Sequence, residues 1–325
     1  MVTKLIYNVG LLFIMMLPGI ILKKCKLSTD GLGKGISNLV LYIAQPVLIF
    51  LAYVRPYDSE VLINSLWVLL FSIIGQAIFA VVSHFVYMKA PDSARRMLRF
   101  ATIFSNAAFM GIPLISAVLG NDATIYASVY NISFNAFLWT LGVNICIKDR
   151  DVDGDGIGDG EHLKKKSGAS ITKAMLHPTM IAAALGLVFF FLPIDTYIPD
   201  IITESLTMLK NLVAPLSMVV IGMRLADLDL RGFFKDKYLY IFLVLRHLAL
   251  PALVFFVMRA VALFVTIDNT VMMSVLIMAS APSATSGTMF AEMYDCDAAY
   301  VSKLVAVSTI LSLATMPLVS LLMNI

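Results

Sequence analysis

Two long apolar stretches, at matching places in the two halves of the chain, are interrupted by small, polar and helix-breaking residues. The first interruption is Ser105–Leu114 and the second is Ser280–Thr288. Both stretches are otherwise long enough to cross a bilayer, where an unpaired backbone group costs several kcal/mol. An opened backbone is therefore tolerated only where it is buried in protein or lines a cavity. One such break in each half indicates a transporter whose binding site lies where two inverted repeats meet.

The composition supports a membrane protein with many spans. The chain is 60% hydrophobic and 14% charged, whereas a soluble domain is about 45–50% apolar and about 25% charged. The net charge of +3 does not indicate nucleic-acid binding, because the basic residues fall in short loops between apolar runs. Cys25, Cys146 and Cys296 are far apart and belong to no metal-binding or disulfide pattern. No cofactor is expected.

Ten apolar segments approach the roughly 20 residues that a membrane-spanning helix requires. They are residues 4–22, 33–54, 61–88, 96–119, 122–147, 174–193, 201–224, 237–264, 269–292 and 299–323. We therefore predict an all-α polytopic membrane protein with ten transmembrane helices, numbered here in chain order.

The distribution of basic residues predicts the orientation. Most of the 24 Lys and Arg residues lie in four loops: 23–34, 89–99, 148–173 and 224–237. The positive-inside rule places these loops in the cytoplasm and both termini outside. The cytoplasmic loop 148–173 separates a first five-helix repeat, 1–147, from a second, 174–325. Because each half holds an odd number of helices, the halves insert in opposite orientations, as in an inverted repeat.

Four strings, in order, carry a resemblance to a known family. Asn106–Leu114 reads Asn-Ala-Ala-Phe-Met-Gly-Ile-Pro-Leu, Ala281–Ala284 reads Ala-Pro-Ser-Ala with Ala291–Tyr294 after it, and Ser308–Leu318 closes the chain. Arg246 stands five residues before Pro251 in helix 8. With these strings the chain resembles the auxin efflux carrier family along its whole length.

The resemblance implies ten helices in which helices 4 and 9 break at Pro113 and Pro282 and cross. It also implies a scaffold of helices 1, 2, 6 and 7, a transport domain of helices 3–5 and 8–10, an elevator-like motion and a homodimer. Bacterial relatives are regarded as carriers of small carboxylates such as malate or malonate. We therefore expect a secondary transporter of mono- or dicarboxylates in the cytoplasmic membrane, embedded in lipid, and not an enzyme.

The half-helix ends at the breaks suit a carboxylate, because they present free N–H groups and a positive dipole end. The polar, flexible or basic residues at or facing the breaks are candidates for substrate binding. They are Gln45, Asn106, Gly111, Pro113, Asn131, Asn135, Lys210, Arg246, Pro282, Ser283, Thr285 and Ser286. A charge in mid-membrane is functional by default, which applies to Lys210 and Arg246. Arg246 has a structural alternative, tying helix 8 to open carbonyls near the crossing.

Several alternatives stay open at this point. A sodium-coupled carrier of the bile-acid type is one, although no acidic residue stands clearly at mid-membrane; a non-transporting membrane sensor is another. His84 and His247 are candidate proton carriers, while Phe190 is expected to face lipid. The loop Asp151–Asp159 resembles the start of a calcium-binding EF-hand loop, but His162 stands where a bidentate glutamate belongs.

Overall fold

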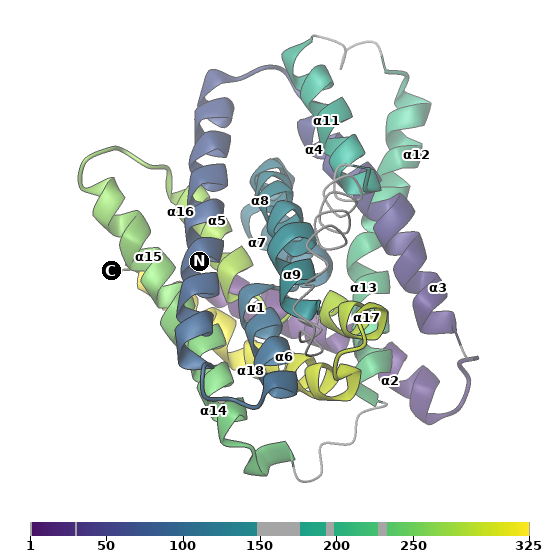
Figure 1. Cartoon of the computed structure of the whole chain (residues 1–325). Coiled ribbons are helices and arrows are strands. Elements are labelled where there is room, and N and C mark those ends of the chain that lie inside the picture. Colours follow the sequence, from purple (N-terminus) through teal and green to yellow (C-terminus); the bar gives the residue numbers. More distant parts are fainter. Residues whose placement is uncertain (1, 30, 148–175, 193–197, 227–232, 325) are drawn as a thin grey trace, which may run out of the picture.

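The protein is described here by a computed structural model covering residues 2–29, 31–147, 176–192, 198–226 and 233–324 (Figure 1). The EF-hand-like loop lies outside these residues. The first half contains α1 (Val2–Ile14), α2 (Leu17–Lys24), α3 (Leu32–Leu39), α4 (Gln45–Tyr53), α5 (Ser59–Val86), α6 (Asp92–Ile103), α7 (Ile112–Leu119), α8 (Thr124–Phe137) and α9 (Val143–Cys146). The second contains α11 (Pro178–Phe191), α12 (Asp200–Asn211), α13 (Val213–Ala226), α14 (Lys237–Val244), α15 (Leu250–Ala262), α16 (Asn269–Ser280), α17 (Ser286–Met293) and α18 (Ala298–Ser320).

The predicted all-α class is confirmed for the described residues, which contain no strand and only one isolated β-bridge. Six helices among them are long and apolar enough to cross a membrane. They are Thr3–Lys24, Leu32–Tyr53, Ser59–Val86, Asp200–Ala226, Lys237–Ala262 and Ala298–Met323. Shorter apolar helices cover Ala107–Leu119, Pro178–Phe191 and Asn269–Ser280.

Four π-helical turns, η1 (Val40–Ala44), η2 (Ala107–Gly111), η4 (Leu138–Gly142) and η7 (Leu245–Ala249), continue into α-helices. Three of them are followed by a proline at the second position of the next helix: Pro46, Pro113 and Pro251. Proline lacks an N–H and its ring crowds the carbonyl four residues earlier. A wider π turn just before the proline relieves that crowding, so the helix passes through each proline.

The break predicted at Pro113 is therefore wrong in position. The helix is continuous from η2 through α7, and the interruption lies earlier, at residues 104–106 between α6 and η2. Pro282, in contrast, does lie in the non-helical segment 281–285 that separates α16 from α17. A residue before proline is disfavoured in the helical region, which explains why Ala281 is extended (φ −56°, ψ 148°) and α16 stops at Ser280.

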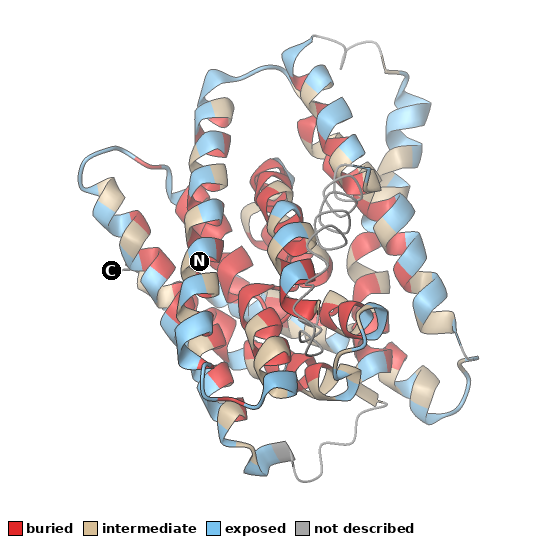
Figure 2. Cartoon of the chain, viewed as in Figure 1, coloured by how far each residue is buried: buried red, intermediate tan, exposed pale blue. Residues whose placement is uncertain are grey.

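The helices pack in two sets. On the right of Figure 1, α4 packs against α11 and α12, and α13 packs against α2 and α3. Towards the centre and left, α5 packs against α6, α8 and α16, and α18 packs against α16 and α17. The buried residues concentrate on the inner faces of the central helices (Figure 2).

Helices α2 and α13 approach each other backbone to backbone. A Cβ atom added at Gly19 would overlap the carbonyl oxygen of Val219, and one added at Gly222 would overlap the carbonyl oxygen of Met16. Each glycine thus admits the backbone of the opposite helix, which is how small residues tighten helix contacts in membranes.

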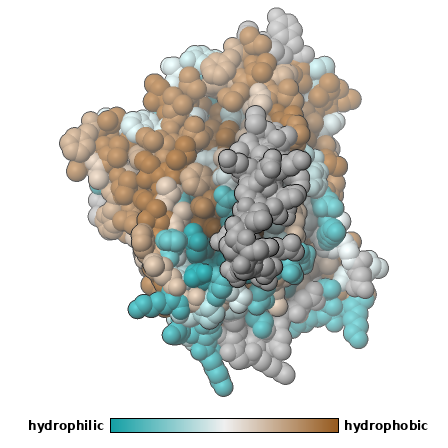
Figure 3. All heavy atoms as spheres, in the orientation of Figure 1, coloured by the Kyte–Doolittle hydropathy of each residue, from teal (hydrophilic) through white to brown (hydrophobic). Residues whose placement is uncertain are grey.

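The outer surface carries a broad apolar region. On the face in Figure 3 it occupies the upper part, while polar residues gather at the lower edge, where α2 ends and α14 begins. One expectation about this surface was wrong: Phe190 is buried (2% exposed), whereas its neighbour Phe191 is 53% exposed. Both are apolar, and both rings lie near Tyr57 in the loop after α4, at 5.4 and 5.9 Å between centroids, so this contact does not separate the two.

Candidate functional site

Two unwound segments, one from each half of the chain, meet at the centre of the structure. Ser105 and Ser283 form an isolated antiparallel bridge. On either side of it, the amide of Asn106 donates to the carbonyl of Pro282 (2.6 Å) and the amide of Ala284 donates to the carbonyl of Phe104 (2.9 Å). We call residues 104–106 and 282–284 the crossing. Its backbone groups pair across the two halves, so few are left open where the helices stop.

The helix that leaves the crossing, residues 107–119, begins with unused hydrogen-bond donors. The amides of Met110 and Gly111 both donate to the carbonyl of Asn106 (3.1 Å each). The three amides before them, at residues 107–109, have no acceptor assigned within the described part of the chain, as expected for a helix N-terminus. The Asn106 side chain is 2% exposed, and its Nδ2 also has no partner there. Backbone and side chain together present donors beside a positive dipole end.

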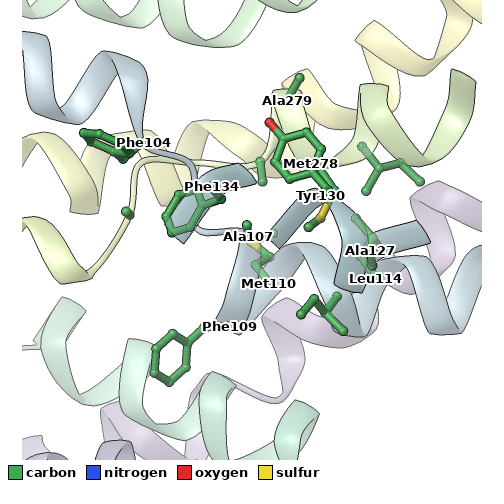
Figure 4. Close-up of a cluster of buried hydrophobic side chains, with 14 of the residues drawn as sticks. Phe104, Ala107, Phe109, Met110, Leu114, Ala127, Tyr130, Phe134, Met278 and Ala279 are labelled. Atoms are coloured by element: carbon green, nitrogen blue, oxygen red, sulfur yellow. The ribbon is translucent and has the colours of Figure 1, made fainter. Parts of the chain in front are cut away.

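Apolar side chains surround these donors (Figure 4). Phe104, Phe134, Tyr130 and Met278 lie around Ala107 and Met110, and Phe109 points away from them; η2 as a whole packs against α13. Gly111 faces Met278 of α16, since a Cβ at position 111 would lie 2.5 Å from the Met278 sulfur. Gly111, a candidate for substrate binding, thus makes room for a methionine side chain in this structure.

Arg246 is fully buried (0% exposed) in η7, beneath the crossing. Its Nη1 donates to the carbonyl of Thr102 (3.4 Å) and its Nη2 to the carbonyl of Ala281 (2.5 Å). These carbonyls stand at the C-terminal ends of α6 and α16. Arg246 therefore makes the contacts expected of a structural residue, because its one guanidinium bonds to open carbonyls at both helix ends.

The residues of the helix-9 break are engaged with the protein. Ser283 Oγ donates to the carbonyl of Ala101 (2.6 Å), and the Ser283 amide donates to Ser308 Oγ (2.9 Å). The Thr285 carbonyl accepts from Nη1 of Arg224 (2.9 Å), while Ser286 is half-buried at the start of α17. Arg224, at the end of α13, was assigned from the sequence to a cytoplasmic loop. Its contact with the break had no signal in the sequence, because the partner is a backbone atom.

His247 lies in a hydrogen-bonded chain that reaches the crossing. Its Nε2 is 2.8 Å from Ser308 Oγ and its Nδ1 is 3.0 Å from Thr315 Oγ1. Thr315 donates its own proton to the Leu311 carbonyl (3.1 Å), so it accepts from Nδ1–H. Nε2 is then the acceptor for Ser308, and the ring is neutral with all partners satisfied. His84, by comparison, is exposed on α5.

A cavity of about 290 Å³ lies between α4, α7 and the α12–α13 junction. Its apolar wall includes Leu48, Pro113 and Ala214, and two basic side chains, Arg55 and Lys210, line it. Nη1 of Arg55 is 3.8 Å from a carboxylate oxygen of Asp122. Lys210 has no ion-pair partner among the residues the structure describes. Arg55 was not among the candidates from the sequence, although its place directly after the predicted helix 33–54, before Pro56, was an available signal.

On α4 and α13, a polar side chain lies one helical turn away from a residue that lines the cavity. Gln45 precedes Leu48 on α4, and Ser217 follows Ala214 on α13, each by three residues and hence on the same helix face. Both side chains are buried, and Gln45 Oε1 and Ser217 Oγ have no hydrogen-bond partner in the described chain. On the third wall, the N-terminus at Ala107 lies about 9 Å along the helix from Pro113. None of these three positions lines the cavity itself.

Asn131 and Asn135 are buried one turn apart on α8. Asn135 Nδ2 donates to the carbonyl of Asn131 (2.8 Å), which is a bond within the helix. The structure thus gives Asn135 a local partner.

Bundled helices with an apolar outer surface, unwound backbone paired at their centre and a cavity lined by two basic side chains define a membrane transporter. A family model described as "Membrane transport protein" matches residues 5–320. The chain belongs to this family, that of the auxin efflux carriers, as its motifs indicated.

Two relatives agree with this assignment. An uncharacterized transporter of Methanothermobacter thermautotrophicus is 26% identical over 312 residues, and one of Methanocaldococcus jannaschii is 24% identical over 316 residues. Each alignment covers 95% of this chain and 95% of the relative. Transporter function, and not enzymatic activity, is what the family and these relatives support.

Proposed function

We propose that this chain carries small organic anions, mono- or dicarboxylates, across the cytoplasmic membrane. The observation that carries the proposal is the set of unused donors at Asn106 and residues 107–109, beside a helix N-terminus. Such a group favours an anionic acceptor. The nearby C-terminal carbonyls, in contrast, already accept from Arg246. The site therefore has hydrogen-bond donors to spare, and these suit an acceptor such as a carboxylate.

We propose that the fold is a 5+5 inverted repeat of ten spans. Helix 4 would be α6 with η2 and α7, and helix 9 would be α16 with α17, the two broken helices that cross. In support, each apolar segment predicted as a span is mostly helical where it is described, and the fourth and ninth are interrupted at residues 104–106 and 281–285. The two interruptions also stand at matching places, the first in the fourth segment and the second in the ninth.

The scaffold proposed for the carrier comprises helices 1, 2, 6 and 7, and the transport domain comprises helices 3–5 and 8–10. The packing preferences of α4, α11 and α13 on one side and of α5, α8 and α16 on the other agree with this division, while α1 packs against α7 and α18 across it. The cavity lies between α4 and the α12–α13 junction, from the first set, and α7, from the second. An elevator-like movement of the second set past the first would carry the anion from one side of the membrane to the other.

The proposed orientation has both termini outside and a homodimer formed through the scaffold. Basic residues such as Lys24, Arg95 and Lys235 stand at the end of the molecule where α2 ends and α6 and α14 begin, which supports a cytoplasmic placement of that end. The dimer rests on the family resemblance.

Uptake into proteoliposomes tests the function directly. The purified protein is reconstituted, and labelled mono- and dicarboxylates, a labelled amino acid and a labelled sugar are offered under an imposed membrane potential. We expect saturable uptake of at least one carboxylate and none of the sugar. Uptake of neutral solutes alone would refute the anion assignment.

A further inference from the structure

The guanidinium of Arg246 lies between the C-terminal ends of two half-helices. α6 ends at Ile103 and α16 ends at Ser280, and Arg246 donates to Thr102 of the first and to Ala281, directly after the second. A helix C-terminus carries a partial charge of about −0.5. Two such ends sum to about −1, which one guanidinium charge of +1 balances.

No side-chain carboxylate provides an alternative balance. Within the described ranges, no Asp or Glu lies within ion-pair distance of Arg246, which is fully buried. The guanidinium carbon also lies 5.3 Å from the centroid of the Phe79 ring. A buried charge without a partner would be costly. The helix ends are therefore the counter-charge that keeps Arg246 in place.

Three further carbonyls in and beside the crossing also accept from donors of the protein. Ala101 accepts from Ser283 Oγ, Phe104 accepts from the Ala284 amide, and Pro282 accepts from the Asn106 amide. In transporters with broken helices, unwound carbonyls and half-helix C-terminal ends are the groups that hold sodium. Here each of these three oxygens accepts an N–H or O–H group of the protein, and the two carbonyls at the half-helix C-terminal ends accept from Arg246.

We propose that Arg246 is a resident cation that takes the place of a coupling sodium ion at the crossing, so that the anion is carried without sodium. Arg246 acts as a positioning residue: it fixes the two C-terminal ends, and the substrate is held by the opposite, N-terminal end at residues 106–109. The inference goes beyond the proposed function, since it concerns how transport is coupled and not what is transported.

The first test is ion replacement with the unmodified protein. Carboxylate uptake into proteoliposomes is measured with sodium, potassium or choline as the only monovalent cation. Coupling free energies between linked ligands change affinity about 5- to 150-fold, so we expect a change of less than about twofold when sodium is removed. A tenfold loss would overturn the inference while leaving the anion assignment intact.

The second test does not require a substrate. The thermal unfolding midpoint of detergent-purified Arg246→Ala is measured with millimolar guanidinium or choline chloride, well below the molar range in which guanidinium denatures proteins. A cation that binds only the folded state raises its stability. We expect guanidinium, compared with choline, to raise the midpoint of Arg246→Ala but not that of the unmodified protein.

Controls separate this role from a merely structural one. Arg95→Ala removes a surface guanidinium paired with Asp92 and is expected to show no response to guanidinium. Arg246→Lys keeps the charge but loses the planar fork, so we expect partial transport that is still independent of sodium. If Arg246→Ala does not fold, the lysine variant and ion replacement decide the question. A folded Arg246→Ala that ignores guanidinium, or a lysine variant that requires sodium, would contradict the inference.

Discussion

Asn106 and Pro282, 176 positions apart in the sequence, are joined by a 2.6 Å hydrogen bond from the amide of the first to the carbonyl of the second. This bond closes the pairing of the crossing and fixes the position of the helix that follows. Because the Asn106 amide proton is used in it, the asparagine side chain and the next three amides are the donors left for a ligand. The same bond that holds the two halves together therefore orients the proposed anion site.

Asn106→Ala should reduce carboxylate transport strongly. A hydrogen bond to a charged group contributes about 1.5–3 kcal/mol, so we expect a loss of affinity of about 10- to 150-fold. Asn106→Asp should be worse, since it places a negative charge against the substrate. Concentration-dependent uptake measures both effects. Asn8→Ala, which removes a side chain bonded only within α1, is the control, and an Asn106→Ala variant with unchanged affinity would contradict the site.

The two break prolines should differ in their effects. Pro282 forces the extended backbone that ends α16, so Pro282→Ala lets the helix extend and disturbs the crossing. Pro113 follows a π turn inside a continuous helix and is remote from the break. Losing one hydrogen bond of the crossing costs about 1 kcal/mol or more, so we expect Pro282→Ala to lower transport at least about fivefold and Pro113→Ala to lower it less.

Initial uptake rates at equal protein content compare the Pro282→Ala and Pro113→Ala variants. Pro199→Ala, at an exposed position, is the control. The reverse order, with Pro113→Ala more damaging, would return the functional break to Pro113.

Lys210→Gln should weaken capture of the anion from the cavity. A partly exposed charge contributes up to about 1 kcal/mol, which corresponds to an increase in half-saturating concentration of up to about fivefold. The maximal rate should change little, because the crossing is intact. Lys4→Gln, exposed on α1, is the matched control. An equal loss in both variants would mean that Lys210 acts only through the general surface charge.

Gly222→Ala should destabilise the protein by pushing α13 away from α2. The added methyl group would overlap the carbonyl of Met16, and overpacking costs about 1–3 kcal/mol. Gly10→Ala is the matched control, since a Cβ at that position meets nothing within 4 Å. Thermal unfolding in detergent compares them: Gly222→Ala should unfold at a lower temperature and Gly10→Ala should not.

Much of the helical organisation was predictable because hydropathy over about 20 residues is a strong signal. The predicted segment 33–54 closely matches the helix Leu32–Tyr53, and 237–264 matches Lys237–Ala262. Hydropathy does not reveal which face of an apolar helix is covered. Phe190 and Phe191 are indistinguishable by composition, and only the packing of α11 separates the buried ring from the exposed one.

The candidate site was predictable where it depended on residue type and not where it depended on backbone partners. Asn106 and Pro282 stood out as polar and helix-breaking residues in apolar runs. The position of the first break could not be predicted from the sequence, because a π turn before Pro113 lets the helix continue. The hydrogen bonds of Arg246 and Arg224 end on carbonyl groups, which every residue has, so the sequence could not name their partners.

The native cysteines provide a test of the proposed orientation. Cys25 is exposed directly after α2, and Cys296 is half-buried in the turn between α17 and α18. Cys296 Sγ lies 3.8 Å from Nη1 of Arg96, near the start of α6. All three positions belong to the end of the protein proposed to be cytoplasmic.

A membrane-impermeant maleimide should therefore leave both thiols unmodified in intact cells and should modify both in inside-out vesicles. The hydrogen bond with Cys146, reinforced by Arg96, lowers the pKa of the Cys296 thiol to about 7. Because the thiolate is the reactive form, labelling of Cys296 should rise steeply as the pH increases through 7. Mass spectrometry of the labelled peptides gives the result, with Cys25→Ser and Cys296→Ser identifying each site. Modification of Cys25 in intact cells would reverse the orientation and place both termini in the cytoplasm.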